Sequence, residues 1–137
     1  MAYFRLAFTA VFVFISFGLQ AQTVSLIGAS EEFILENVSG YAVSEHRAIE
    51  HEEFDVLVFE DKDRELSFFF TFYKGAKICS FIKNRAPLSS LGKEIDFVQT
   101  NFRKIQENIW EKPDKRAQVQ ISEADGMVVI LAREIRE

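Results

Sequence analysis

The stretch LSFFFTFYKGAKICSFIK, which begins at Leu66, constrains the fold of this chain more than any other part of its sequence. Four phenylalanines and a tyrosine lie within the six positions from Phe68 to Tyr73. Aromatic residues favour β-strands, and the Lys-Gly-Ala sequence that follows favours a turn. The stretch therefore predicts a β-hairpin in which KICSFIKN returns beside an aromatic strand.

Successive residues of a strand point to opposite faces of a sheet, so the aromatic strand has two different faces. The wholly apolar face suits the packing of a long amphipathic helix and carries Leu66, Phe68, Phe70 and Phe72. The mixed face carries Ser67, Phe69, Thr71 and Tyr73. Two interpretations of the mixed face stay open. Either a short N-terminal helix covers Phe69 and Phe81, or an exposed patch for a partner is formed by Phe69, Tyr73 and Phe81.

The length of the turn decides which residues of the hairpin face each other. A three-residue loop, 74–76, sets Phe72 opposite Ile78, whereas a two-residue loop sets it opposite Lys77. Gly75 suits the shorter turn. The longer loop keeps apolar and polar side chains on separate faces, and it sets Phe69 opposite Phe81. We expect the longer loop, because burial of several large side chains outweighs a turn preference.

The other patterns predict two helices and four more strands. Ser30 and the acidic residues after it favour a short helix that ends near Gly40. Strand patterns occur in YAVSEHRAI and EFDVLVFE, and again in AQVQIS and MVVILARE, which flank a turn at residues 124–126. Apolar residues spaced by three and four positions predict a long amphipathic helix from Leu91 to Ile109, which has ended by Pro113.

The resulting element order is α-β-β-β-β-α-β-β. Runs of hairpin strands with two helices between them indicate the α+β class. We expect an antiparallel sheet of about six strands with one long amphipathic helix and one short N-terminal helix. No linker rich in Pro, Gly or Ser divides the chain, so residues 22–137 are predicted to form a single α+β domain.

The first 21 residues differ from the rest. Arg5 is followed by an uncharged, mostly apolar run from Leu6 to Leu19, and then by the small residue Ala21. This is the pattern of a secretory signal peptide. The run is shorter than the roughly 20 residues that span a bilayer as a helix. We expect residues 1–21 to be a signal peptide, cleaved near Ala21, and the protein to be periplasmic or extracellular. The alternative is an uncleaved N-terminal membrane anchor.

Nucleic acid is not an expected partner. The chain of 137 residues has 21 acidic and 16 basic side chains, a formal net charge of −5. The basic residues are scattered, whereas phosphate contacts need clustered Lys and Arg.

Motifs for catalysis and metal binding are weak. His46 and His51 lie among acidic residues, but their spacing of five does not bring them to one face of a strand or helix. DKDRE, which begins at Asp61, lacks the glycine and the glutamate of a calcium loop. Cys79 is the sole cysteine, and we expect it to be a buried strand residue. We predict no catalytic residue, metal or cofactor.

These patterns predict a small exported binding or interaction module. The expected contact residues are Phe69, Tyr73 and Phe81, and the expected partner is a second copy in a homodimer, another protein or an apolar ligand. Two alternatives stay open. One is a secreted hydrolase-like enzyme whose catalytic groups converge only in the fold. The other is a protein anchored to a membrane by its uncleaved N-terminal segment.

Overall fold

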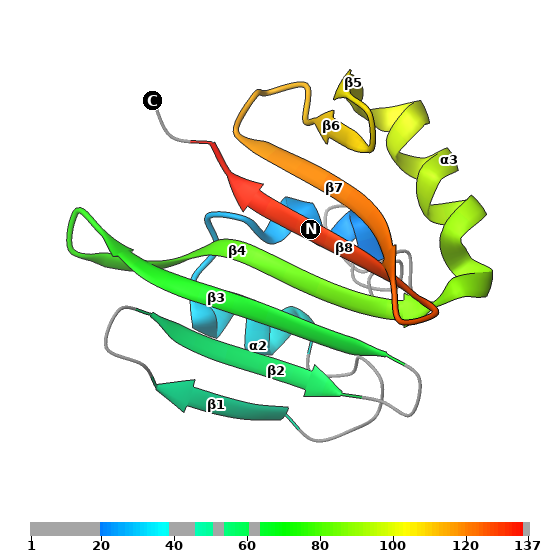
Figure 1. Ribbon diagram of the computed structural model, residues 1–137. Coiled ribbons are helices and arrows are strands. Elements are labelled where there is room, and N and C mark those ends of the chain that lie inside the picture. Colours follow the sequence, from blue (N-terminus) through cyan, green and yellow to red (C-terminus); the bar gives the residue numbers. More distant parts are fainter. Residues whose placement is uncertain (1–19, 39–45, 51–53, 61–63, 136–137) are drawn as a thin grey trace, which may run out of the picture.

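Eight antiparallel strands form one sheet in the spatial order β1-β2-β3-β4-β8-β7-β6-β5 (Figure 1). The structure, a computed structural model, describes residues 20–38, 46–50, 54–60 and 64–135. The strands are β1 (His46–Glu50), β2 (Asp55–Glu60), β3 (Glu65–Tyr73), β4 (Ala76–Pro87), β5 (Arg103–Gln106), β6 (Ile109–Glu111), β7 (Ala117–Ala124) and β8 (Met127–Glu134). The helical elements are the 3-10 helices η1 (Gln20–Leu26) and η3 (Leu88–Ser90) and the α-helices α2 (Glu31–Val38) and α3 (Leu91–Asn101). The predicted α+β class with an antiparallel sheet is confirmed.

The order of elements contains an internal repeat that the sequence does not reveal. A helix followed by a four-stranded antiparallel meander occurs twice, as α2 with β1 to β4 and as α3 with β5 to β8. The final strands of the two halves, β4 and β8, pair in the middle of the sheet, from Phe81 opposite Arg133 to Pro87 opposite Met127. Every strand of the second half is shorter than its counterpart in the first, which obscures the repeat.

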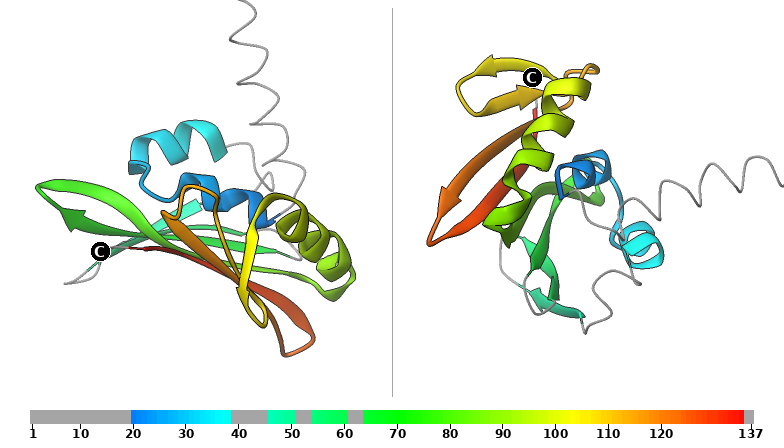
Figure 2. Two further views of the ribbon diagram at one scale, coloured as in Figure 1. Left: turned by 90° about the horizontal axis from the view of Figure 1, so that it is seen from above. Right: turned by 90° about the vertical axis from the view of Figure 1, so that its right-hand side faces the viewer.

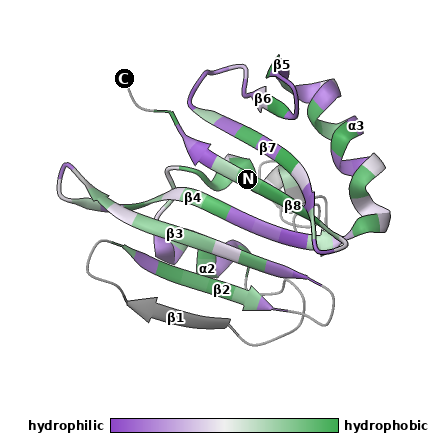
Figure 3. Cartoon of the chain, viewed as in Figure 1, coloured by the Kyte–Doolittle hydropathy of each residue, from purple (hydrophilic) through white to green (hydrophobic). Residues whose placement is uncertain are grey.

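One face of the sheet carries the hydrophobic core. Figure 2 shows η1, α2 and α3 on this face, and Figure 3 shows the apolar residues that run through the central strands. Fully buried strand residues on this face include Leu57, Phe68, Phe70, Ile82 and Ile130. The aromatic strand therefore buries its apolar face on the helix side, with one exception. Phe72 is 72% exposed, because it lies near the turn, where the hairpin extends past the end of β8. The long helix expected over this strand, α3, lies beside β7 instead, and α2 lies behind β3 (Figure 1).

Two buried polar contacts hold η1 against this core. The Ala21 N–H donates to Oε1 of Glu94 on α3 at 3.1 Å, and Nδ2 of Asn84 on β4 donates to Oγ1 of Thr23 at 2.9 Å. All four residues are buried. A buried carboxylate or amide is costly unless it is hydrogen-bonded, so these contacts select one position for η1. The expected boundary between signal segment and domain, after Ala21, falls inside this element, so cleavage there would remove the contact of Ala21 with Glu94 and keep that of Thr23 with Asn84.

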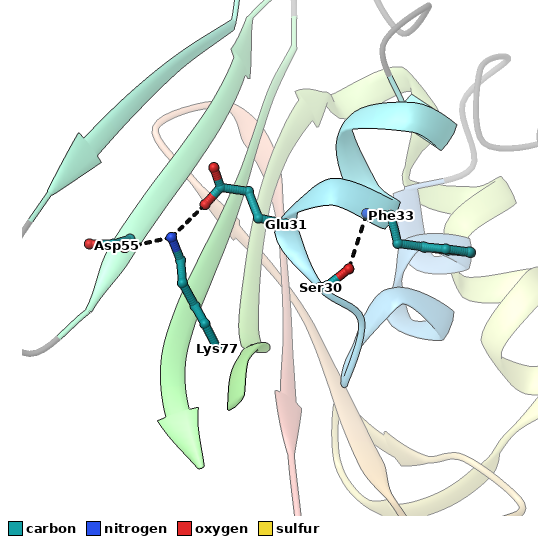
Figure 4. Close-up of polar contacts among 5 residues, drawn as sticks. All are labelled: Ser30, Glu31, Phe33, Asp55 and Lys77. Atoms are coloured by element: carbon teal, nitrogen blue, oxygen red, sulfur yellow. Dashed lines mark hydrogen bonds and ion pairs between the residues drawn. The ribbon is translucent and has the colours of Figure 1, made fainter. Parts of the chain in front are cut away.

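Polar contacts also fix the start of α2 (Figure 4). Oγ of Ser30 accepts a hydrogen bond from the Phe33 N–H at 3.1 Å, which confirms the predicted cap. Nζ of Lys77 on β4 lies 2.7 Å from carboxylate oxygens of both Glu31 and Asp55. Hydrogen bonds to Asp55 and then to Glu31 raise the pKa of Lys77. Because Glu31 lies on α2 and Asp55 on β2, Lys77 connects this helix to two strands.

The predicted long helix is wrong in its second half. α3 ends at Asn101, and the next residue, Phe102, is extended, with φ −124° and ψ 168°. Residues 103–111 form the β5–β6 hairpin, with Asn108 at φ 64° in its turn. The ring of Phe102 packs on Phe97 with centroids 5.7 Å apart, so it stays with α3 after the helix has ended. This hairpin supplies the two strands beyond the expected six.

The β3–β4 hairpin combines both predicted registers. Near the turn the two-residue loop holds, with Phe72 opposite Lys77. A β-bulge then leaves Ser80 unpaired, and beyond it the register of the three-residue loop applies, with Phe69 opposite Phe81. The expectation of a three-residue loop is therefore wrong at the turn, while the aromatic pairing that motivated it is present.

Two substitutions in β3 test this division between core and surface. Phe68→Ala should lower the free energy of unfolding by about 3–5 kcal/mol, because it empties a fully buried site. Phe72→Ala is the matched control, with the same residue type on the same face of the same strand, and should change stability by no more than about 0.5 kcal/mol. Urea unfolding measures both. Equal losses of unfolding free energy in the two variants would contradict the burial of Phe68 and the exposure of Phe72.

Candidate functional site

No described helix lies over the second face of the sheet, which we call the open face (Figure 2). Cross-strand pairing assigns its side chains, because directly opposed residues share a face. One row across the open face contains Phe69, Phe81, Arg133 and Gln118. The next row contains Ser67, Lys83, Leu131 and Gln120. The open face thus mixes aromatic, aliphatic, amide and cationic groups, and it also carries Glu65 and Glu111, opposite Arg85 and Gln118.

Three phenylalanines form an aromatic cluster on the open face. Phe69 lies between Phe54 and Phe81, with ring centroids 5.6 Å and 5.4 Å apart, respectively. All three side chains are only partly buried. The sequence predicted the contact of Phe69 with Phe81 but missed Phe54. The sequence showed only that Phe54 shares a face with Val56, because alternate strand residues do so. That Val56 pairs with Phe69 is known only from the structure.

The backbone of Tyr73 lies away from this cluster. Tyr73 ends β3 opposite Ala76, beside the turn. Its backbone lies four residues beyond Phe69, roughly 13 Å along the strand. The structure thus brings two of the three predicted contact residues together and places the third toward the tip of the hairpin.

The interpretation in which the short helix covers Phe69 and Phe81 is wrong. α2 buries Ile34 and Val38 in the core cluster that contains Phe68 and Phe70. Those residues alternate with Phe69 along β3 and point to the opposite face. The helix therefore lies on the far side of the sheet from the aromatic cluster.

A small hollow adjoins the aromatic cluster. Its lining includes Phe81, Ile109, Leu131, Gln118, Gln120 and Arg133. Apolar side chains from β4, β6 and β8 form one part of the wall, and amide and guanidinium groups from β7 and β8 form another. Sequence reasoning missed this hollow, because Ile109 was assigned to the predicted long helix instead of to a strand beside β7.

Three cations, Lys83, Arg85 and Arg133, point from the centre of the open face, and we call them the face cations. Nε and Nη2 of Arg133 donate to Oε1 of Gln118 at 3.2 Å and 2.9 Å, which orients the guanidinium. Nη2 of Arg85 lies 3.6 Å from the sulfur of Met127. Within the described part of the chain, none of the face cations forms an ion pair, although Glu65 is the cross-strand neighbour of Arg85.

The described residues offer little for catalysis or metal binding. Cys79 is fully buried in β4, and burial raises the pKa of its thiol to about 12. No group of three or more His, Cys, Asp or Glu side chains in the described ranges could hold a metal ion. His46 lies in β1, while His51 and the DKD of the predicted charged turn fall outside the described residues.

The raised pKa of Cys79 predicts a thiol that is inert in the folded protein. At pH 8 a thiol with a pKa of about 12 is ionised in only about one molecule in ten thousand, and the thiolate is the reactive form. Ellman's reagent should therefore label the folded protein no faster than it unfolds. Protein unfolded in urea, where the thiol has an ordinary pKa of about 8.5, is the control and should react at once. Rapid stoichiometric labelling of folded protein would contradict the described burial.

No helix in residues 20–38 or 64–135 is long and apolar enough to cross a membrane. Comparison with models of protein families, with curated proteins and with solved structures found no match.

Proposed function

We propose that this chain is a small exported binding module that holds its partner on the open face. The observation that supports the proposal is the aromatic cluster, three partly buried phenylalanines on a sheet face that no described helix covers. Grouped apolar side chains on an uncovered surface commonly mark an interaction site. Phe69 and Phe81 are the central contacts, and Tyr73 extends the surface toward the tip of the hairpin.

The architecture suits this role. Phe68 and Phe70 are buried in the core on either side of Phe69 in the sequence, so the backbone that carries Phe69 is firmly fixed. A contact residue on a rigid strand loses little conformational freedom when a partner binds, and this lowers the cost of association. The same alternation therefore provides stability on one face and a preformed contact surface on the other.

The proposal predicts that Phe69→Ser removes binding while Phe33→Ser does not. Phe33 is 42% exposed on α2, on the helix side, which makes it a matched control for the loss of an exposed phenylalanine. We expect Phe69→Ser to lower the fluorescence of a bound apolar dye several-fold, or to convert a dimer to a monomer in light scattering. Phe69→Leu retains an apolar contact and should keep most of the signal. If Phe69→Ser, still folded by circular dichroism, changed neither readout, the open face would not be the binding surface.

We also propose that residues 1–21 direct export and are then removed. The charged start, apolar run and small residue of this segment support this proposal. Expression of the full chain in a secreting bacterial host, followed by intact mass measurement, tests it. The expected exported product begins at Gln22. A product that still contains residues 1–21 would overturn export with cleavage and favour the membrane anchor instead.

A further inference from the structure

We propose that the partner of the open face is an acidic peptide segment. One apolar side chain of the peptide enters the hollow, and a neighbouring carboxylate of the peptide meets Arg133. This inference rests on the proposed function, because it names the chemistry of the partner for the same face.

The hollow fits one apolar side chain with a polar group beside it. Phe81, Ile109 and Leu131 supply apolar contacts, while Gln118 and Arg133 line the same hollow. Gln118 accepts two hydrogen bonds from Arg133, so the guanidinium is held in place before a ligand arrives. An arginine oriented in this way loses little entropy when it binds a carboxylate, and charge-assisted hydrogen bonds are among the stronger ones.

The face cations favour a partner that carries negative charge. The chain as a whole carries a net charge of −5, yet Lys83, Arg85 and Arg133 gather at the centre of the open face without an ion pair among the described residues. Lys83 and Arg85 are two residues apart on β4, so their side chains leave the sheet on the same side roughly 7 Å apart. Carboxylates at a similar spacing in an extended peptide would complement them.

A second copy of this chain is disfavoured as the occupant. In a two-fold symmetric dimer whose axis passes through the centre of this face, the face cations of one copy would lie close to those of the other. Like charges brought together in this way cost free energy. An anionic membrane surface is also disfavoured, because the apolar groups of this face either line the hollow or are partly buried, whereas a bilayer favours apolar side chains that project.

Peptide binding to the exported protein tests the inference. The probe is a fluorescein-labelled twelve-residue peptide that repeats Asp-Glu-Leu, and binding is followed by fluorescence anisotropy at low salt. Two matched peptides carry Asn-Gln-Leu, which removes the charge, and Asp-Glu-Ser, which removes the apolar anchor. We expect each change to weaken binding about tenfold or more. We also expect 0.5 M salt to weaken binding of the acidic probe strongly.

Variants of the face cations locate the site. Arg133→Gln and Lys83→Gln should each weaken binding of the acidic probe. Lys93 is exposed on α3, on the helix side, so Lys93→Gln should not weaken it. The double reversal Arg133→Glu with Lys83→Glu should switch preference to a peptide that repeats Lys-Lys-Leu. Both face residues are exposed, so these changes should leave the fold intact.

The outcomes separate this inference from the proposed function. Equal binding of the charged and neutral peptides, or no effect of Arg133→Gln, would overturn the acidic partner. If Phe69→Ser still abolished dye binding in that case, the open face would remain the binding surface. A dimer that dissociates on Phe69→Ser, or binding to anionic vesicles but to none of the peptides, would also overturn the inference. If neither the peptide changes, nor the cation variants, nor Phe69→Ser altered binding, both the acidic partner and the binding role of the open face would be overturned.

Discussion

The pairing of β4 with β8 is the contact on which the rest of the structure depends. It joins the two halves of the sheet, and β4, at 12 residues, is the longest strand. Its core-side residues Ile82, Asn84 and Ala86 are buried, while the residues that alternate with them, Phe81, Lys83 and Arg85, form the middle of the open face. A slip of one residue would exchange these two sets, so a single register fixes both the core and the proposed binding surface.

The bulge at Ser80 makes this arrangement compatible with a tight turn. Without it, the register of the two-residue loop would continue, set Phe69 opposite Ser80 and turn Phe81 toward the core. The extra residue returns Phe81 to the open face, where its ring lies 5.4 Å from that of Phe69. Oγ1 of Thr71 donates to Oγ of Ser80 at 3.1 Å, which gives the unpaired residue a local partner. The bulge is thus the local feature that assembles the aromatic cluster, and bulges often redirect side chains in this way.

Much of the fold could be predicted from residue patterns. The predictions that failed share one cause, which is that a local pattern does not show which strands become neighbours. Ser30 capped a helix as expected, and the aromatic strand buried Phe68 and Phe70. The spacing of Ile105 and Ile109 matched a helix but equally permitted a short hairpin, which packing beside β7 selected. Phe54 was missed because a pattern shows which residues share a face of one strand and not which strand lies next to it.

The sequence by itself determined the α+β class and the aromatic hairpin, because alternation and turn chemistry are local properties, whereas the contact of Phe69 with Phe81 also needed the bulge at Ser80. Only the tertiary structure decided that η1, α2 and α3 lie on one face, that the halves join through β4 and β8, and that Arg133 lines a hollow on the other face. These features depend on pairing between residues such as Phe81 and Arg133, far apart in the chain. Which distant strands pair depends on how much apolar surface the whole sheet removes from water, and a short stretch of sequence does not show that area.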